Sequence, residues 1–359
     1  MMFSNIQVLQ AAAAYSVVGL HLVDSWNNYT GAHFGYSIDF PGGFNGLFFV
    51  ISGFVNAEAT RNRATKPLEF IRKRLVRIIP LYWALSVAIF ITTLFGLKTL
   101  GIETPDLRRL ILSLFFLPTF ENGVLVSPTL FVGWTLNFQV PFYLLFGLAL
   151  SFERYVCKEI TLSACITVLY ILSMIIKRPE LGYYLDELLL GFVLGLLISR
   201  LHCGCPSFLE RIRLEIFVTC LAIGSVFLVG TALISTGVLL QHQHAFIAIA
   251  GAMMVFGAVG LEAKGMVMRR KVVLLQGAAS YSIFLVHPLI LQFAGKAMIL
   301  TGLNVTIPGT LIGYGVTLAL VSITGTAIHL YIERPVSEAL RPKPSSAPLS
   351  KFSGLRRRA

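Results

Sequence analysis

Long apolar segments alternate with short polar ones along most of the chain. A helix needs about 20 mostly apolar residues to cross the hydrocarbon core of a bilayer. Ten segments approach this length, near residues 6–24, 44–60, 77–97, 131–151, 160–176, 183–200, 215–235, 244–262, 279–298 and 309–331. Because a helix satisfies its own backbone hydrogen bonds, it is stable in lipid. The pattern predicts an all-α fold, a polytopic transmembrane helical bundle of about ten spanning helices.

A shorter apolar run at residues 107–119 contains Arg108 and Arg109 near its start. Its length and charge favour a helix that lies at the membrane interface or re-enters it. An eleventh span at 107–119 is the alternative.

Composition and the distribution of charge support a membrane protein. Hydrophobic residues make up 56% of the 359 residues and charged residues 13%, whereas soluble domains carry roughly 25% charged residues. The net charge of +12 is concentrated in segments 61–77, 263–272 and the tail, and loops 25–43, 120–130, 236–243 and 299–308 contain no Lys or Arg. With ten spans, all the basic segments fall on one side, which the positive-inside rule makes the cytoplasm. Both termini are then cytoplasmic, and nucleic acid is not an expected partner.

The chain divides into two parts of different composition. Residues 1–335 form the predicted transmembrane domain, and residues 336–359 form a basic tail rich in Pro, Ser, Lys and Arg. We expect the tail to be disordered and to lie against anionic lipid. The first apolar run has no preceding Lys or Arg, so we expect it to be retained rather than cleaved. Cys203 and Cys205 are too close for a common zinc pair, so no metal site is predicted.

Several ionisable residues lie within the predicted spans, where charge is costly and often functional. His21 lies near the outer end of the first span, His287 midway along the ninth, and His329 near the inner end of the tenth. Histidine suits proton transfer near neutral pH, but each could instead be a packing residue bonded to a neighbouring carbonyl. Asp186 and Glu187 lie close to a boundary, and we expect them to be solvated.

Arginines between residues 72 and 77 precede the third span, and Pro80, Tyr82 and Trp83 follow them. This pattern is typical of a topology determinant with an aromatic anchor. The arginine side chains also match phosphate geometry. They are therefore candidates to bind a nucleotide-bearing acyl donor from the cytoplasmic side.

Six short motifs, in order along the whole chain, resemble the acyltransferase 3 family of integral membrane O-acyltransferases. They are Ile6-Gln7-Val8-Leu9 with His21, Phe48 to Phe54, Arg74 to Tyr82 with Arg77 and Pro80, Gly133-Trp134-Thr135-Leu136 with Phe142-Tyr143, Ser280-Tyr281-Ser282 with His287-Pro288, and Glu333-Arg334-Pro335. Each motif is weak alone, and their order carries the resemblance. The resemblance is nearest to the branch acting on exopolysaccharides and rhizobial lipo-oligosaccharides.

The resemblance implies transfer of an acyl group, usually acetyl, from cytoplasmic acyl-CoA to a hydroxyl of an extracytoplasmic glycan. The glycan would be an exopolysaccharide, O-antigen, peptidoglycan or lipo-oligosaccharide. Acetyl-CoA would be a co-substrate, with no tightly bound cofactor, and membrane lipid would surround the protein in a bacterial inner membrane. His21 would act as general base or carry the acyl group transiently. The expected donor- or substrate-binding residues are Gln10, Arg74, Arg77, Tyr82, Trp134, Thr135, Gln139, Ser280, Tyr281 and His287.

The chain departs from the family pattern at four positions. Gln10 stands where the family has arginine, Gln139 where it has glutamate, and Gly46 and Ala278 where it has acidic residues. Each change removes a charge from the membrane interior. A non-catalytic relative acting in glycan assembly is therefore an alternative. A glycan transporter is a third, although no internal repeat of the kind common in transporters is visible.

Overall fold

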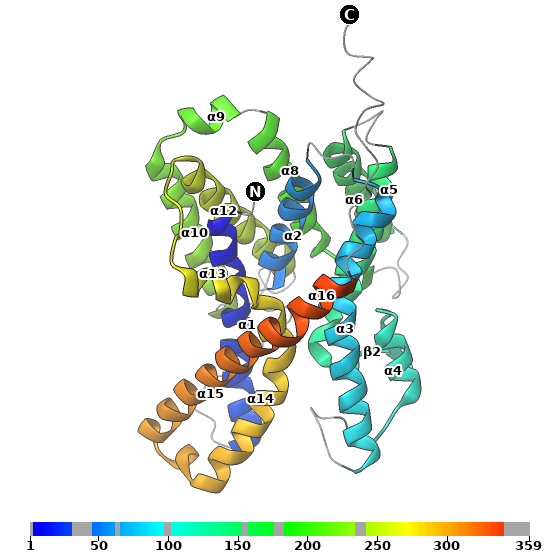
Figure 1. Cartoon of the computed structure of the whole chain (residues 1–359), viewed down its shortest axis with the longest axis vertical. Coiled ribbons are helices and arrows are strands. Elements are labelled where there is room, and N and C mark those ends of the chain that lie inside the picture. The colour runs from blue at the N-terminus through cyan, green and yellow to red at the C-terminus, as the bar shows by residue number, and fades with distance from the viewer. Residues whose placement is uncertain are drawn as a thin grey trace, which may run out of the picture.

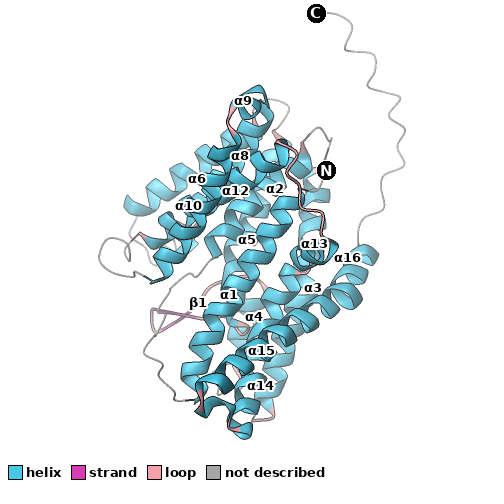
Figure 2. Ribbon diagram, turned by 90° about the vertical axis from the view of Figure 1, so that its left-hand side faces the viewer, coloured by secondary structure: helices cyan, strands magenta, loops and turns pink. Residues whose placement is uncertain are grey.

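The computed structural model describes residues 3–30, 45–61, 65–96, 104–152, 157–175, 186–204, 206–233 and 242–340, and the single positions 102, 183 and 184. The predicted loop 25–43 and the predicted disordered tail lie largely outside the described residues. Within the described part, the fold is almost entirely helical (Figures 1 and 2).

Ten long helices coincide with the ten predicted apolar segments in the part of the chain that is described. They are α1 Ser4–Thr30, α2 Asn45–Thr60, α3 Pro67–Leu94, α5 Leu136–Ser151, α6 Lys158–Ile175, α8 Leu189–Gly204, α10 Leu214–Leu233, α12 Gln243–Ala263, α14 Ser280–Thr301 and α15 Ile307–Ile328. Seven helical segments here are long and apolar enough to cross a membrane, and α8 is apolar but shorter. The chain is thus a polytopic helical membrane protein, and the number of ten spans stays a prediction.

Short elements join the long helices. They are α4 Leu107–Leu114, β1 Thr119–Glu121, β2 Val124–Val126, η1 Phe131–Thr135, α9 Pro206–Arg211, α13 Lys271–Ala278, η2 Leu303–Val305, the π-helical turn η3 His329–Glu333, and α16 Arg334–Leu340. The helix α9 lies at one end of the molecule, and the turn between α14 and α15 lies at the other (Figures 1 and 2).

The segment 107–119 does not form an eleventh span. Its helix α4 has eight residues, which rise only about 12 Å. Asp106 caps this helix by accepting a hydrogen bond from the Arg109 N–H at 3.0 Å. The indole N–H of Trp83 donates to the Leu114 carbonyl at 2.9 Å and ties the helix to α3. These contacts agree with the predicted short interfacial or re-entrant helix.

A small β-hairpin follows α4 and departs from the all-α prediction. Strands β1 and β2 pair antiparallel, with Glu121 opposite Val124. Asn122 and Gly123 both have positive φ, 51° and 80°, which is the conformation that a two-residue hairpin turn requires. The turn therefore depends on an Asn-Gly pair, which tolerates this backbone better than other residues.

Helices α1 and α14 pack closely and run parallel. A Cβ atom on Gly277, just before α14, would lie 2.2 Å from the Gln7 carbonyl oxygen of α1. Farther along the chain, the His21 ring of α1 contacts the His287 ring of α14. The start of α1 is fixed by Glu262 of α12, whose carboxylate accepts from the backbone N–H of Asn5 at 2.8 Å. The helix α1 is therefore held in place both at its start, by Glu262, and near His21, by its contact with α14.

Candidate functional site

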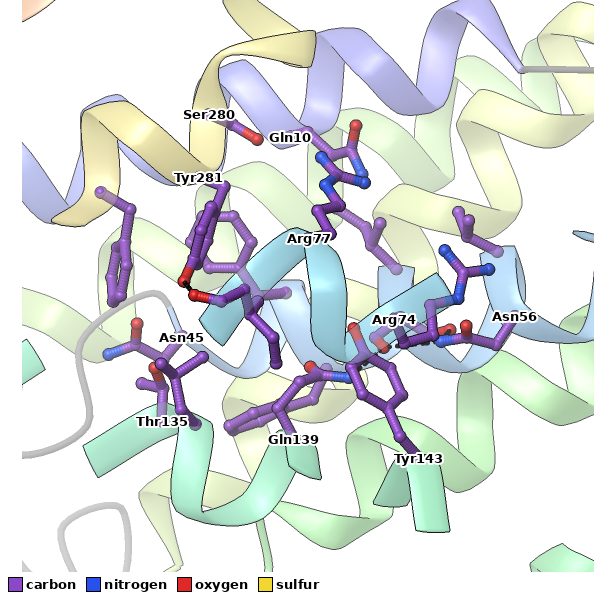
Figure 3. A pocket seen from close by; sticks show the side chains of 18 residues that line it. Gln10, Asn45, Asn56, Arg74, Arg77, Thr135, Gln139, Tyr143, Ser280 and Tyr281 are labelled. Atoms are coloured by element: carbon purple, nitrogen blue, oxygen red, sulfur yellow. Dashed lines mark hydrogen bonds between the residues drawn. The ribbon is translucent and has the colours of Figure 1, made fainter. Parts of the chain in front are cut away.

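A polar cleft lies among α1, α2, α3, α5 and α14 (Figure 3). It encloses about 860 Å³, including its open mouth. Its polar lining residues are Gln10, Asn45, Ser52, Asn56, Arg74, Arg77, Thr135, Gln139, Tyr143, Ser280 and Tyr281. Aromatic and aliphatic side chains such as Phe48 and Ile78 complete its walls. Apolar walls with a few converging polar groups are typical of ligand sites.

The cleft is elongated along α2. Asn45 and Asn56 line it from positions eleven residues apart on that helix, a rise of about 16 Å. Figure 3 shows Asn45 and Thr135 toward one end of the cleft and Asn56 and Arg74 toward the other. Arg74 therefore lies near one end, and Arg77 lies farther along the cleft beside Gln10. The end at Asn45 and Thr135 is lined by uncharged side chains.

Two arginines, one helical turn apart on α3, lie in the cleft. The Arg74 guanidinium lies 5.5 Å from the centre of the Phe70 ring. The Arg77 Nε lies 3.5 Å from a carboxylate oxygen of Glu333. The structure thus brings the two predicted phosphate-binding arginines into one site.

A row of neutral polar side chains runs along the cleft between α5 and α2. The Gln139 amide donates to the Ser52 hydroxyl oxygen at 2.6 Å. The Asn56 amide donates to the same oxygen at 3.0 Å and to the Ser52 carbonyl at 2.7 Å. Gln139 therefore keeps a hydrogen-bonding role at a position where the family carries a charge, and Gln10 lines the same cleft.

Tyr281 and Ser280, two of the predicted binding residues, line the cleft at the start of α14. The Tyr281 hydroxyl donates to the Ile78 carbonyl at 2.6 Å and joins α14 to α3. Thr135 lines the opposite wall, and its hydroxyl donates to the Val132 carbonyl at 3.0 Å.

Tyr82 and Trp134, also predicted as binding residues, are not among the residues that line the cleft. Tyr82 is fully buried and stacks on Phe116 with ring centroids 5.4 Å apart. A Cβ atom on Gly133 would lie 2.4 Å from the Tyr82 ring, so glycine permits this contact. Trp134 packs edge-on against Phe138. Both residues support the walls of the site from behind.

Two histidines lie together beyond the uncharged end of the cleft. The rings of His21 and His287 are nearly parallel, with centroids 5.4 Å apart, and Phe131 contacts the His21 ring edge-on at 5.1 Å. His287 comes one helical turn after Phe284, which lines the cleft. The contact between His21 and His287 joins two positions that the sequence assigned to different spans.

The hydrogen bonding of His287 fixes its tautomer. Its Nδ1 lies 2.7 Å from the Phe284 carbonyl, and a carbonyl can only accept, so Nδ1 carries the proton. The ring is fully buried, and its Nε2 has no hydrogen-bond partner. The bond to Phe284 matches the packing role weighed from the sequence. The remaining nitrogen is an acceptor next to His21.

One buried carboxylate that was not among the predicted site residues, Glu333, lies behind Arg77. Glu333 accepts from the Ser282 hydroxyl at 2.7 Å and from His329 Nδ1 at 2.8 Å. The motif Glu333-Arg334-Pro335 and the four-residue spacing of His329 and Glu333 are the sequence signals for this cluster.

The prediction that Asp186 and Glu187 are solvated is wrong in part. Asp186 lies 2.7 Å from His244 Nδ1, and Glu187 lies 2.6 Å from His242 Nδ1. Their side chains are 31% and 16% exposed. These pairs connect the residues just before α8 to the start of α12. The facing histidines stabilise two carboxylates that lie near the end of a span.

Comparison with known proteins agrees with these observations. Residues 3–326 match a family described as an acyltransferase domain. The chain is similar to the "Exopolysaccharide production protein ExoZ" of Rhizobium meliloti (strain 1021), with 31% identity over 298 residues, 81% of this chain and 87% of that protein. No solved structure matches significantly. A family match over nearly all the helical part, together with motifs that converge on one cleft, shows that the chain belongs to the acyltransferase 3 family of membrane acyltransferases.

Proposed function

We propose that the protein is a membrane O-acyltransferase that moves an acetyl or related acyl group from cytoplasmic acyl-CoA to a hydroxyl of an extracytoplasmic glycan. An exopolysaccharide is the first candidate acceptor, because the similar Rhizobium protein is named for exopolysaccharide production. The single observation that carries the proposal is the arrangement of the cleft. Both arginines lie away from the Asn45 end of the cleft, and a histidine pair lies beyond that end.

The arginine end suits the anionic part of the donor. Arg74 and Arg77 present guanidinium groups one turn apart in the cleft, and guanidinium groups bind phosphate with paired hydrogen bonds. The basic segment 61–77 is on the cytoplasmic side in the predicted topology. Acyl-CoA supplied by the cytoplasm would thus meet these residues first.

The row of neutral polar side chains along the cleft suits the pantetheine arm of the acyl-CoA donor. Pantetheine carries amide groups but no charge, and Gln10, Ser52 and Gln139 offer donors and acceptors without charge. A charged side chain here would have to be desolvated by the arm at a cost. The loss of charge at Gln10 and Gln139 is therefore compatible with donor binding.

The histidine end suits the chemical step. His21 accepts the proton of the acceptor hydroxyl while the hydroxyl oxygen attacks the thioester carbonyl carbon. The carbon–sulfur bond then breaks, and the thiolate of CoA takes up the proton that His21 received. Alternatively, His21 carries the acyl group before it passes to the glycan. The products are an ester and free CoA in both routes.

A non-catalytic role in glycan assembly is the second candidate. The charge-free positions Gln10, Gly46, Gln139 and Ala278 favour it. Under this reading, restoring arginine at position 10 and glutamate at position 139 leaves function unchanged or damages it. Under the acyltransferase proposal, the acyl groups of the cell-surface glycans are present only when the gene is present.

The decisive experiment is mass spectrometry of cell-surface glycans from strains with and without the gene. The proposal predicts a mass difference of one acyl group per modified unit, which is lost without the gene and restored by complementation. Glycans of unchanged mass but altered amount would support the assembly role and contradict the acyltransferase.

A further inference from the structure

Glu333 is a buried carboxylate for which the transfer reaction gives no direct role. Its side chain is 3% exposed, and it lies at the end of the π-helical turn η3. It is not among the residues that line the cleft. A carboxylate at this depth is costly unless several donors satisfy it.

Two hydrogen-bond donors and one ion-pair partner, from three parts of the chain, converge on Glu333. Its Oε2 accepts from Ser282 of α14 at 2.7 Å and from His329 Nδ1 at 2.8 Å. Its Oε1 lies 3.5 Å from Arg77 Nε of α3. Both oxygens are therefore engaged, and Ser282 and His329 hold the carboxylate from the side away from Arg77.

Arg77 is the only partner in this cluster that also lines the cleft. Its side chain is 40% exposed, whereas that of Glu333 is 3% exposed. The contact with Glu333 uses the Nε edge of the guanidinium. The end edge of the planar group, formed by the two terminal amino groups, remains available to an anion.

We propose that Glu333 is a positioning residue that orients the Arg77 guanidinium so that its terminal amino groups bind the anionic end of the donor. The inference rests on the proposed function, because it takes the donor to be an acyl-CoA. Arginine has a long and mobile side chain, and fixing it before the donor arrives lowers the entropy lost on binding. Arg74 is steadied differently, against the ring of Phe70.

A purely structural role is the competing explanation, since Glu333 also joins α3, α14 and the last helix. The two roles differ in one measurable respect. Positioning acts through Arg77, so removing Arg77 removes the effect of Glu333 on donor binding. A structural role does not depend on Arg77 in this way.

The experiment measures binding of CoA, the probe, to the full-length purified protein in detergent, for wild type, Glu333→Gln, Arg77→Gln and the double variant. Glu69→Gln is the matched control, because Glu69 forms an exposed ion pair with Lys73 on the same helix. We expect Arg77→Gln to weaken CoA binding about tenfold or more, and Glu333→Gln about fivefold. The double variant should bind as Arg77→Gln does, and Glu69→Gln as wild type.

Two results would overturn this inference and leave the proposed function intact. One is wild-type affinity in Glu333→Gln, and the other is an equal loss from Glu333→Gln with and without Arg77. If Glu333→Gln does not fold, Ser282→Ala replaces it, because it removes one donor that holds the carboxylate. We then expect about a twofold loss that disappears in Arg77→Gln, and a loss independent of Arg77 overturns the inference. A wild type that does not bind CoA overturns the proposed function and this inference together.

Discussion

At the scale of single residues, the contact between His21 and His287 marks the end of the site where we propose that the reaction occurs. The His287 ring is fully buried, and the His21 ring is partly buried in contact with Phe131. The His287 proton is fixed on Nδ1 by the Phe284 carbonyl. His21 is the partly exposed member of the pair, so it is the histidine that a substrate hydroxyl can reach.

Replacing His21 with alanine should therefore lower the rate of glycan acylation by a factor of about 100 or more. The variant protein should still accumulate in the membrane. Mass spectrometry of the glycans and immunoblotting of membranes measure the two effects. His242→Ala is the matched control, because His242 is 44% exposed and held by Glu187 away from the cleft. Unchanged acylation in His21→Ala would remove His21 from its role.

Seven residues predicted from motifs line the cleft, namely Gln10, Arg74, Arg77, Thr135, Gln139, Ser280 and Tyr281. Five of them belong to the recognised motifs, and Gln10 and Gln139 were found as departures from the family pattern. Ser52 and Asn56 were missed as binding residues, since single neutral side chains in a span are usually packing residues. The hydrogen bond from Gln139, which lies on another helix, shows that Ser52 belongs to the row of polar side chains in the cleft.

At the scale of elements, close backbone contact between α2 and α8 holds one wall of the cleft. A Cβ atom on Gly195 would lie 2.1 Å from the Val50 carbonyl oxygen, and one on Gly53 would lie 2.3 Å from the Phe192 carbonyl oxygen. Small residues allow such approach between helices in membranes. The helices cannot come this close with side chains at these positions.

Gly195→Ala should separate α2 from α8 and destabilise the protein by about 2 kcal/mol, as overpacking typically does. Thermal unfolding in detergent should show a lower midpoint. Gly230→Ala is the control, since a Cβ atom at Gly230 meets nothing within 4 Å, and its midpoint should be unchanged or higher. Equal midpoints for Gly195→Ala and Gly230→Ala would contradict the close contact.

Hydropathy alone located the long helices well, because length and apolar content determine which segments enter lipid. It did not find the hairpin at residues 119–126, whose Asn122-Gly123 turn is a local signal hidden between short apolar runs. It also could not pair Glu187 with His242, since 55 residues separate them. Such pairs depend on how helices pack against one another.

At the scale of the whole molecule, the orientation in the membrane determines whether the arginines face the cytoplasm. The end of α8 that leads into α9 and the turn between α14 and α15 lie toward opposite ends of the fold (Figures 1 and 2). The first contains Cys203 and the second contains Val305. Cys203 is exposed, and Val305 is 78% exposed. The positive-inside rule places Cys203 inside and Val305 outside.

A membrane-impermeant maleimide tests this orientation in spheroplasts. Val305→Cys in a cysteine-free background should be labelled in intact spheroplasts. A chain that keeps only Cys203 should be labelled after permeabilisation alone. Labelling of Cys203 from outside would reverse the orientation and place Arg74 and Arg77 on the wrong side for cytoplasmic acyl-CoA.

Transfer by the purified protein across a membrane tests the central claim most directly. Proteoliposomes would receive acetyl-labelled acetyl-CoA outside and carry deacetylated exopolysaccharide in the lumen. The account predicts that label enters the enclosed polysaccharide with wild-type protein and not with His21→Ala. The account would be contradicted if the label stayed on CoA although the wild-type protein binds CoA. It would also be contradicted if transfer occurred only when the donor and the polysaccharide are on the same side of the membrane.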